Sequence, residues 1–261
     1  MFTRHALVRR PSPRLADGLI THISRSDDVN AELAQRQWDG YVSALRDAGW
    51  TTHEVPAAPE CPDSVFVEDT MVVYHDLAVI CRPGADERWP EVFAAEDAVR
   101  AQGYRTVRIE PPGTLDGGDV LKHDGIVWVG VGGRTNAAGV EQLQAHLESS
   151  GVSVLTVPLT RALHLKSAVT ALPDGTIVGW EPVVDDPGVW GEKFLAVPEE
   201  PGAHVVLLDN DALLMSSAAP QTALLFTQRG YRVVAVDISE FEKLEGCVTC
   251  LSVRLRGRPA H

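Results

Sequence analysis

The sequence predicts a single α/β domain with mixed sheets, and two observations favour that fold class. Pairs of short apolar segments with the two-residue period of strands alternate several times with single segments of helical period. The intervals are uneven, so the pattern is neither a regular βαβ series nor an all-β sandwich. No linker, repeat or low-complexity segment divides the 261 residues, a length that can bury one full core.

In the N-terminal half, turn and capping residues mark the expected elements. Asn30 can cap a helix that runs to about Ala48, because apolar residues recur there at helical spacing. His75-Asp76 interrupts two apolar runs, which indicates a tight hairpin. A second helix is expected at about residues 89–102. The strands expected in this half are residues 5–9, 51–55, 71–74, 77–81 and 105–109.

The C-terminal half continues the same alternation up to about residue 255. Helices are expected at residues 136–150 and 219–229, and the Pro/Gly-rich stretch 182–202 is interpreted as an anchored loop. Residues 1–255 should form the single domain, and residues 256–261 a flexible tail. The strands expected in this half are residues 118–122, 126–131, 153–157, 167–172, 176–180, 204–208, 231–236 and 251–255.

The net charge of −13 argues against binding to nucleic acid or anionic membranes, since both need a basic surface. A small cationic molecule fits this charge better. No segment approaches the ~20 apolar residues of a membrane span, and no signal-peptide core follows Arg9-Arg10. Four cysteines are too few for a disulfide scaffold. We therefore expect a cytoplasmic protein with reduced thiols.

Two cysteines, Cys247 and Cys250, stand in C-x-x-C spacing ahead of a strand-like run. A redox C-x-x-C usually opens a helix, whose N-terminus lowers the thiol pKa, whereas this one precedes a strand. A zinc site would need a second ligand pair, and Cys61 and Cys81 lack that spacing. We favour Cys250 as a nucleophile over a buried structural cysteine, with the redox and zinc interpretations behind both.

Two segments upstream could supply partners for such a nucleophile. His164 is flanked by leucines, which is typical of a core histidine, but it is also the candidate acid–base group for Cys250. Asp116-Gly117-Gly118-Asp119 has the composition of a turn. Its glycines would also let a carboxylate approach and orient an imidazole. The residues alone leave both interpretations open.

Asp63, Glu68 and Asp69 lie within seven residues of largely apolar sequence. Charges among valines are costly unless they are paired. A guanidinium ligand would pair them, because it is planar, always charged and bound by carboxylates in bidentate fashion. Internal salt bridges to Arg82 or Arg88 are the alternative, and we favour a ligand.

The glycines of residues 130–133 precede a helix, which invites a dinucleotide-binding interpretation. The last glycine of G-x-G-x-x-G would fall on Thr135, so the motif fails. Arg134-Thr135-Asn136 at a helix start instead suits an anion such as a carboxylate. A capping Thr or Asn beside a surface Arg is the alternative.

Taken together, these motifs resemble those of the dimethylarginine dimethylaminohydrolases, members of the guanidino-modifying enzyme superfamily with the pentein fold. The resemblance runs nearly end to end, and the order and spacing of so many motifs make it specific. It implies a five-bladed α/β propeller of ββαβ modules around a pseudo-fivefold axis, with the site in the central channel. The motifs are residues 17–19, 62–69, 82–84, 115–119, 134–136, 163–166 and 245–250.

The resemblance implies catalytic and binding roles at matching positions. Cys250 matches the nucleophile, His164 the general acid–base group and Asp116 the carboxylate that orients it, whereas Cys247 is not at the nucleophile's position. The binding positions serve the guanidinium, the pocket wall, the α-amino group and the α-carboxylate. Glu68 and Asp69 match the residues that hold the guanidinium, and Phe66 matches the pocket wall. Asp63, with the backbone carbonyls of Leu19 and Leu244, matches the contacts to the α-amino group. Arg88 and Arg134 match the pair that binds the α-carboxylate.

The activity implied is hydrolysis of Nω-methylated L-arginines to L-citrulline and methylamine or dimethylamine, through a thiouronium on Cys250. No metal or cofactor is expected, the partner is a small cationic amino acid, and the protein should be a monomer or homodimer. An arginine deiminase acting on unmethylated arginine is one alternative, although those enzymes are longer and carry an added helical domain. A pentein-type binding protein without chemistry and a redox C-x-x-C module are the others.

Overall fold

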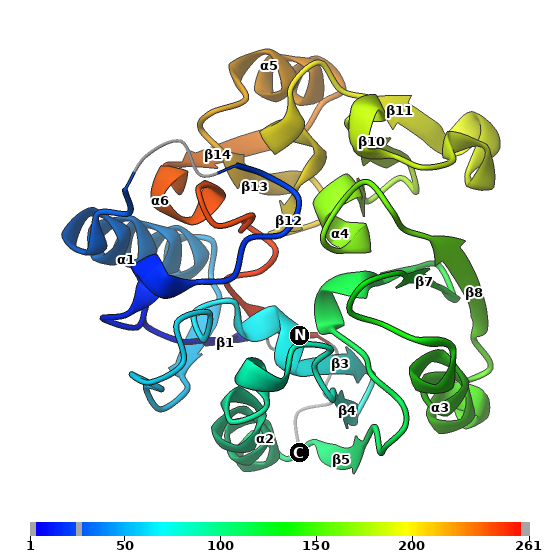
Figure 1. The fold of residues 1–261 in the computed structure, drawn as a ribbon. Helices are drawn as coiled ribbons and strands as arrows, with labels where there is room; N and C mark the ends of the chain where they lie inside the picture. The colour runs from blue at the N-terminus through cyan, green and yellow to red at the C-terminus, as the bar shows by residue number, and fades with distance from the viewer. Residues whose placement is uncertain (1–3, 25–27, 257–261) are drawn as a thin grey trace.

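The computed structural model describes residues 4–24 and 28–256. The strands of this part of the chain form five three-stranded sheets, arranged like blades around one axis (Figure 1). The α/β propeller implied by the resemblance is therefore the observed fold, and it forms one domain.

One blade shows how the local sequence builds the repeat. β3 (Met71–Tyr74) and β4 (Leu77–Ile80) form an antiparallel hairpin, whose turn holds His75 at a φ of 50°. α2 (Glu91–Ala101) then leads to β5 (Arg105–Arg108), which pairs parallel to β4. An antiparallel neighbour needs only a short turn, whereas a parallel one needs a long crossover, here a helix.

Two further blades repeat this order of strand, strand, helix and strand. One consists of β6 (Val120–His123), β7 (Ile126–Val131), α3 (Ala137–Leu147) and β8 (Ser153–Pro158). The other consists of β12 (Val206–Leu207), β13 (Ala212–Ser216), α5 (Pro220–Gln228) and β14 (Arg232–Val236).

The blade of β9 (Val169–Ala171), β10 (Ile177–Gly179) and β11 (Phe194–Ala196) departs from the repeat. Its crossover from β10 to β11 contains three short 3-10 helices between residues 181 and 193 in place of an α-helix. Two prolines in this crossover limit any longer helix, because an interior proline removes a backbone donor and clashes with the preceding turn.

The fifth blade joins the first and last strands of the ring. β15 (Val253–Arg256) pairs antiparallel with β1 (Arg4–Val8), and β2 (Thr51–Glu54) pairs parallel with β1. α1 (Ala31–Asp47) forms the crossover, and the Asn30 side chain caps it by accepting a hydrogen bond from the Leu33 N–H at 2.9 Å. The predicted cap is therefore confirmed.

The structure corrects several local predictions. β13 follows the polar segment 209–211, which is the turn of a hairpin that the sequence analysis does not assign, and β11 lies inside the stretch expected to be a loop. Ser167 and Ala168, expected in a strand, belong to α4 (Leu165–Ala168), and α6 (Ser239–Glu242) is too short to show a helical period. Arg256, expected in the tail, ends β15, and residues 257–261 lie outside the described residues.

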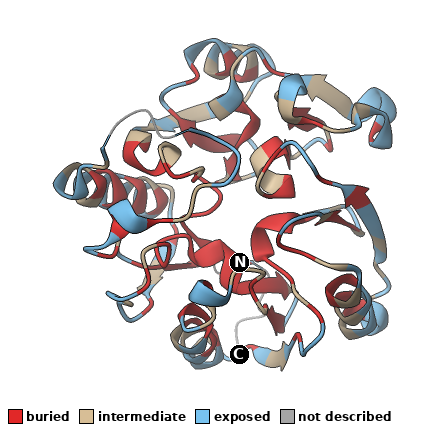
Figure 2. Cartoon of the chain, viewed as in Figure 1, coloured by how far each residue is buried: buried red, intermediate tan, exposed pale blue. Residues whose placement is uncertain are grey.

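The crossover helices α1, α2, α3 and α5 lie at the outside of the ring and turn their buried faces toward the sheets (Figures 1 and 2). In α1 the buried face includes Trp38, Tyr41 and Leu45. No helix in residues 4–24 and 28–256 has the length and apolar character to cross a membrane. The strands β3, β6, β9, β12 and β15 are the innermost ones, and they line a central cavity of about 370 Å³.

Candidate active site

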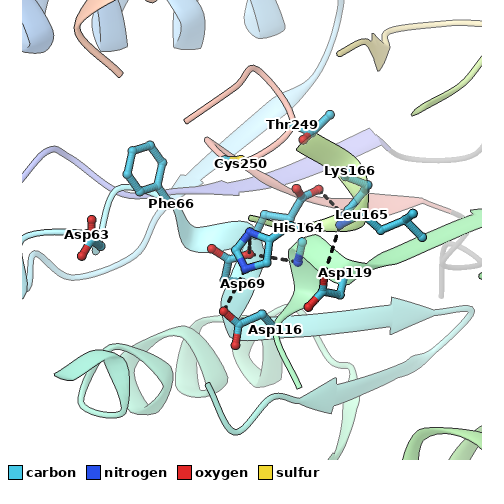
Figure 3. Close-up of polar contacts among 12 residues, drawn as sticks. Asp63, Phe66, Asp69, Asp116, Asp119, His164, Leu165, Lys166, Thr249 and Cys250 are labelled. Carbon is cyan, nitrogen blue, oxygen red and sulfur yellow. Dashed lines mark hydrogen bonds and ion pairs between the residues drawn. The ribbon is translucent and has the colours of Figure 1, made fainter. Parts of the chain in front are cut away.

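Each segment that leads into an innermost strand carries an ionisable or nucleophilic side chain. Because the blades repeat around one axis, these segments meet near it, although they are far apart in the sequence. Figure 3 shows Asp69, Asp116 and His164, from three of the segments, turned toward one another. The segments contribute Glu68 and Asp69 before β3, Asp116 before β6, His164 before β9, His204 before β12, and Cys247 and Cys250 before β15.

His164 lies at the centre of this cluster with 3% of its surface exposed. Its Nε2 lies 3.0 Å from Asp116 Oδ2, and its Nδ1 lies 3.8 Å from Asp69 Oδ1 (Figure 3). Asp116 is held in turn by the Gly84 N–H, which donates to its Oδ1 at 2.9 Å. Burial alone would lower the pKa of His164, but Asp69, Asp119 and Asp116 outweigh burial and raise it to about 9. The imidazole is therefore protonated at neutral pH.

Gly117 and Gly118 allow three segments to approach this closely. A Cβ on Gly118 would lie 2.8 Å from the His164 ring, and a Cβ on Gly117 would lie 2.1 Å from the Glu68 carbonyl oxygen. Any side chain at these positions would force the segments apart. The two glycines therefore form a turn and also bring a carboxylate against the imidazole, so the two interpretations of this motif are compatible.

Both oxygens of Asp69 are bound by protein groups. Oδ2 pairs with Arg88 at 2.6 Å, and Oδ1 accepts a hydrogen bond from the Gly118 N–H at 2.9 Å. Burial alone would raise the pKa of Asp69, but His164 and Arg88 outweigh burial and lower it to about 2. Asp69 is therefore an ionised carboxylate whose partners lie within the protein.

Glu68, the preceding residue, differs in one respect. Its Oε1 pairs with Lys166 at 2.7 Å and also with Arg254. Its Oε2 is buried and has no hydrogen-bond partner among the described residues. A buried acceptor without a donor is costly, so this oxygen is a ready position for the N–H groups of a cationic ligand.

Cys250 is joined to Glu68 through the backbone, because the Glu68 N–H donates to the Cys250 carbonyl at 3.1 Å. The Cys250 Sγ lies 3.2 Å from the Cys247 Sγ. The hydrogen bond with Cys247, burial, and the negative charges of Glu68 and Asp69 raise the pKa of Cys250 well above its usual value. A cation bound beside the two carboxylates would oppose their part of that shift.

Arg88, expected to bind a ligand carboxylate, is surrounded by acceptors of the protein. It forms ion pairs with Asp69 and Glu91, and its Nη2 donates to the carbonyls of Asp63 and Phe66 at 3.2 and 3.1 Å. This is one of the internal salt bridges that were the alternative for the acidic segment. A role for Arg88 toward a ligand stays a prediction.

Arg134 has different surroundings, although the resemblance pairs it with Arg88. It lies just before α3 and is 9% exposed, and its Nη1 is buried without a hydrogen-bond partner in the described part of the chain. Its backbone packs against Gly84, where a Cβ would come within 2.2 Å of the Arg134 carbonyl oxygen. Arg134 is thus an unsatisfied donor, as Glu68 is an unsatisfied acceptor.

The residues expected around an α-amino group lie together. Asp63 Oδ2 accepts a hydrogen bond from the Leu19 N–H at 3.2 Å. A Cβ on Gly18 would lie 2.8 Å from Asp63 Oδ1 and 3.4 Å from Leu244 Cδ2. Leu19, Asp63 and Leu244 therefore border one small region of the structure.

The neighbours of Leu244 connect this region to the rest of the site. The Phe66 ring packs on Gly246, where a Cβ would lie 2.3 Å from a ring carbon. Glu245, whose side chain is 4% exposed, holds the loop that contains Leu19. Its carboxylate accepts hydrogen bonds from the backbone N–H groups of Thr21, His22 and Ile23.

Within the described residues, the group whose ligand atoms come close enough for a metal ion is Asp69, Asp116 and His164, all within 4.8 Å. Their carboxylates already pair with the imidazole and accept hydrogen bonds from backbone N–H groups. These contacts are those of a histidine held by two carboxylates. The expectation that no metal or cofactor is needed stays a prediction.

Two relatives match almost the whole chain. An N(G),N(G)-dimethylarginine dimethylaminohydrolase of Streptomyces coelicolor is 57% identical over 256 residues, or 98% of each chain. A protein of the same name from Pseudomonas aeruginosa is 34% identical over 254 residues, or 96% of this chain and 99% of the relative. The chain belongs to the dimethylarginine dimethylaminohydrolase family. A scan against family models found no match.

Solved structures of the family have the same fold. An adduct of a dimethylarginine dimethylaminohydrolase variant with S-methyl-L-thiocitrulline superposes with a TM-score of 0.90 at 32% identity, covering 98% of this chain and all of the other. A cysteine-to-serine mutant of the Pseudomonas aeruginosa protein, complexed with citrulline, gives 0.89 with the same coverage. The N-terminal domain of ArgZ, a cyanobacterial arginine dihydrolase, gives 0.86 over 96% of this chain at 20% identity, which shows a shared fold alone.

Several contacts at the site are absent from the sequence analysis. Lys166 and Arg254 bind Glu68, and Glu245 binds the loop of Leu19. The sequence does contain a signal for Arg254. It stands between the apolar residues Val253 and Leu255 within a strand, so its side chain is on the opposite face from theirs. Glu245 had none, since its partners are backbone groups more than two hundred residues away.

Proposed function

We propose that this chain hydrolyses Nω-methylated L-arginines to L-citrulline and methylamine or dimethylamine. The proposal rests on one arrangement: the Cys250 thiol, the His164–Asp116 pair and an unsatisfied oxygen of Glu68 gather near the axis of a protein of this family. Relatives named for dimethylarginine hydrolysis, one of them complexed with citrulline, support the choice of substrate and product.

We assign the guanidinium of the substrate to Glu68 and Asp69. Glu68 Oε2 is the acceptor that lacks a donor, and Asp69 adds negative charge next to it. A methylated guanidinium keeps its charge and retains N–H groups, so it can satisfy that oxygen. Phe66 is assigned to the wall of the pocket.

We assign the amino-acid end of the substrate to the opposite groups. Arg134 is the donor that lacks an acceptor, so it is assigned to the α-carboxylate. The α-amino group is assigned to Asp63 and to the backbone carbonyls of Leu19 and Leu244, which border the same region. Arg88 is assigned to holding Asp69 and Glu91 in place, and its predicted contact with the carboxylate is left to experiment.

The first half of the reaction replaces the amine by sulfur. The bound cation offsets the charges of Glu68 and Asp69, which favours ionised Cys250. Its sulfur attacks the guanidinium carbon to give a tetrahedral adduct. The C–N bond to the methylated nitrogen then breaks, and His164, protonated at neutral pH, gives its proton to the leaving amine. A thiouronium on Cys250 remains.

In the second half of the reaction the same histidine acts as a base instead of an acid. Having lost its proton, His164 takes one from a water molecule, and the resulting hydroxide attacks the thiouronium carbon. The C–S bond breaks, the hydroxyl proton of the adduct passes to solvent water, neutral citrulline leaves, and Cys250 returns as thiolate with His164 protonated. Asp116 keeps the ring oriented through both halves by its 3.0 Å contact with Nε2.

The test is citrulline release from asymmetric dimethylarginine, monomethylarginine and arginine in parallel. We expect turnover of the methylated substrates that is abolished in Cys250→Ser and retained in Cys61→Ala, which removes a buried thiol elsewhere. Turnover of arginine alone would make the chain a compact deiminase. Binding of all three without turnover would favour the binding-protein alternative.

The cytoplasmic location stays a prediction. It is supported by the four cysteines, all of which are unpaired in the structure. Fractionation of the source cells, with detection of the protein by antibody, tests it directly.

A further inference from the structure

Cys247 and Cys250 form a chemical unit that hydrolysis does not need. Their sulfurs lie 3.2 Å apart, and both side chains are buried, with 2% and 6% of each residue exposed. The Cys250 N–H donates to the Cys247 carbonyl at 3.1 Å, so the two cysteines are the ends of one tight turn. The proposed mechanism uses only Cys250, and the role of Cys247 is unassigned.

The geometry of this turn suits a disulfide. The ends of such a turn have Cα atoms within ~7 Å of each other, and disulfides span Cα distances of roughly 4.4–6.8 Å. The sulfurs need to approach by about 1 Å to reach the length of an S–S bond, roughly 2.05 Å. Side-chain rotation at the two cysteines can supply that movement, because the backbone already holds them together.

The surroundings also favour reaction between the two sulfurs. The hydrogen bond from Cys250, together with His204 and Thr249, outweighs burial and lowers the pKa of Cys247 to about 5. The same hydrogen bond raises the pKa of Cys250. The two sulfurs thus share one hydrogen bond that stabilises a thiolate within the pair, and the thiolate is the form that peroxides oxidise.

We propose that Cys247 and Cys250 are an oxidation site at which hydrogen peroxide produces an intramolecular disulfide. Peroxide first oxidises one thiolate to a sulfenic acid and leaves as water. The second sulfur attacks the sulfenic sulfur, forms the S–S bond and releases a second water. Each peroxide thus takes two electrons from the pair, and both thiol hydrogens leave in water.

Two consequences follow for the enzyme, and they rest on the proposed role of Cys250 as nucleophile. Disulfide formation removes the nucleophile, so hydrolysis stops, and a thiol reductant restores it. Cys247 also spares Cys250 from the irreversible sulfinic and sulfonic acids, because it captures the sulfenic acid first.

The experiment is peroxide treatment of the whole protein, followed by alkylation, trypsin digestion and mass spectrometry. Cleavage after Lys243 and Arg254 gives a peptide that contains Cys247 and Cys250 and neither of the other cysteines. We expect this peptide to lose two hydrogen masses, to resist alkylation, and to regain two alkylatable thiols after dithiothreitol. This readout is independent of enzymatic activity.

Variants separate the contribution of the pair from general oxidation. In Cys247→Ala we expect Cys250 to progress to sulfinic acid, with a loss of activity that dithiothreitol does not reverse. In Cys61→Ala, which keeps the pair, we expect the wild-type disulfide and full recovery. The inference is overturned if the wild-type peptide keeps two alkylatable thiols under peroxide, or if Cys250 becomes overoxidised equally with and without Cys247.

Discussion

Arg88 and Arg134 are predicted to act as a pair, yet the fold gives them opposite surroundings. Arg88 has acidic and carbonyl partners on all sides, whereas Arg134 has a buried nitrogen without a partner in the described residues. The consecutive residues Asp69 and Glu68 differ in a related way, since both oxygens of Asp69 are bound and one oxygen of Glu68 is not. The groups available to a ligand are therefore recognised by their missing partners rather than by residue type.

The largest expected effect concerns stability at Arg88. Arg88→Met would leave Asp69 and Glu91 buried without their common cation, which should lower the free energy of unfolding by ~3–5 kcal/mol. Urea denaturation followed by circular dichroism measures this. The matched variant Arg134→Met should change the free energy of unfolding by no more than about 1 kcal/mol. Equal losses in the two variants would remove the distinction between the arginines.

The next effect concerns substrate binding at Arg134. Arg134→Met removes a charge-assisted contact of about 1.5–3 kcal/mol, which corresponds to a KM for dimethylarginine about 10- to 150-fold higher. We expect kcat to change much less, because the lost contact is remote from the reacting carbon. Steady-state kinetics on the folded variant test this, with Arg134→Lys as the conservative control. An unchanged KM would reassign the α-carboxylate to Arg88.

The third effect concerns how stability depends on pH, because His164 titrates whereas the two arginines stay charged. Its pKa in the folded protein is about 9, above the ordinary value of 6.5. A raised pKa stabilises the fold fully below pH 6.5, and this contribution is lost as the pH rises through 9. The free energy of unfolding should therefore decline across that window. His164→Gln should flatten the decline, and urea denaturation at several pH values measures both. A decline of equal slope in the variant would assign it to other groups.

The smallest effect concerns the loop that carries Leu19. Glu245→Gln replaces an acceptor-only carboxylate, which binds three consecutive N–H groups, by an amide with donors of its own. We expect faster hydrogen exchange at Thr21 to Ile23 and a several-fold higher KM, with kcat little changed, for a loss of about 1 kcal/mol. Mass-spectrometric hydrogen exchange and kinetics measure these. Glu242→Gln, on the neighbouring α6, is the control and should leave exchange at Thr21 to Ile23 unchanged.

The strands and helices with a clear period are largely those that the sequence predicts. The hairpin at His75-Asp76 and the cap at Asn30 depend on neighbouring residues, so local sequence suffices for them. β11 has only three residues, and all five residues of β13 are buried, so neither strand shows an alternation that could be recognised. The arrangement of five blades is implied by the family resemblance and not by the periodicity.

At the site, the sequence identifies residue types better than their partners. The two glycines after Asp116 signal a close approach, and the structure places the Glu68 backbone and the His164 ring there. The difference between Arg88 and Arg134 has no signal in the sequence, because it depends on which acceptors the fold brings to each guanidinium. Glu91, only three residues from Arg88, is a partner that helical spacing could have suggested.

The pairing of β15 with β1 determines when activity can arise during synthesis. β1 leaves the ribosome first among the strands and must wait for the last one, which completes its blade on the side facing the axis. Cys250 lies just ahead of that strand, so the proposed nucleophile and the final inner strand reach the ring together. A chain that lacks β15 and the segment before it therefore lacks the proposed nucleophile, although it already contains the histidine and the carboxylates around it.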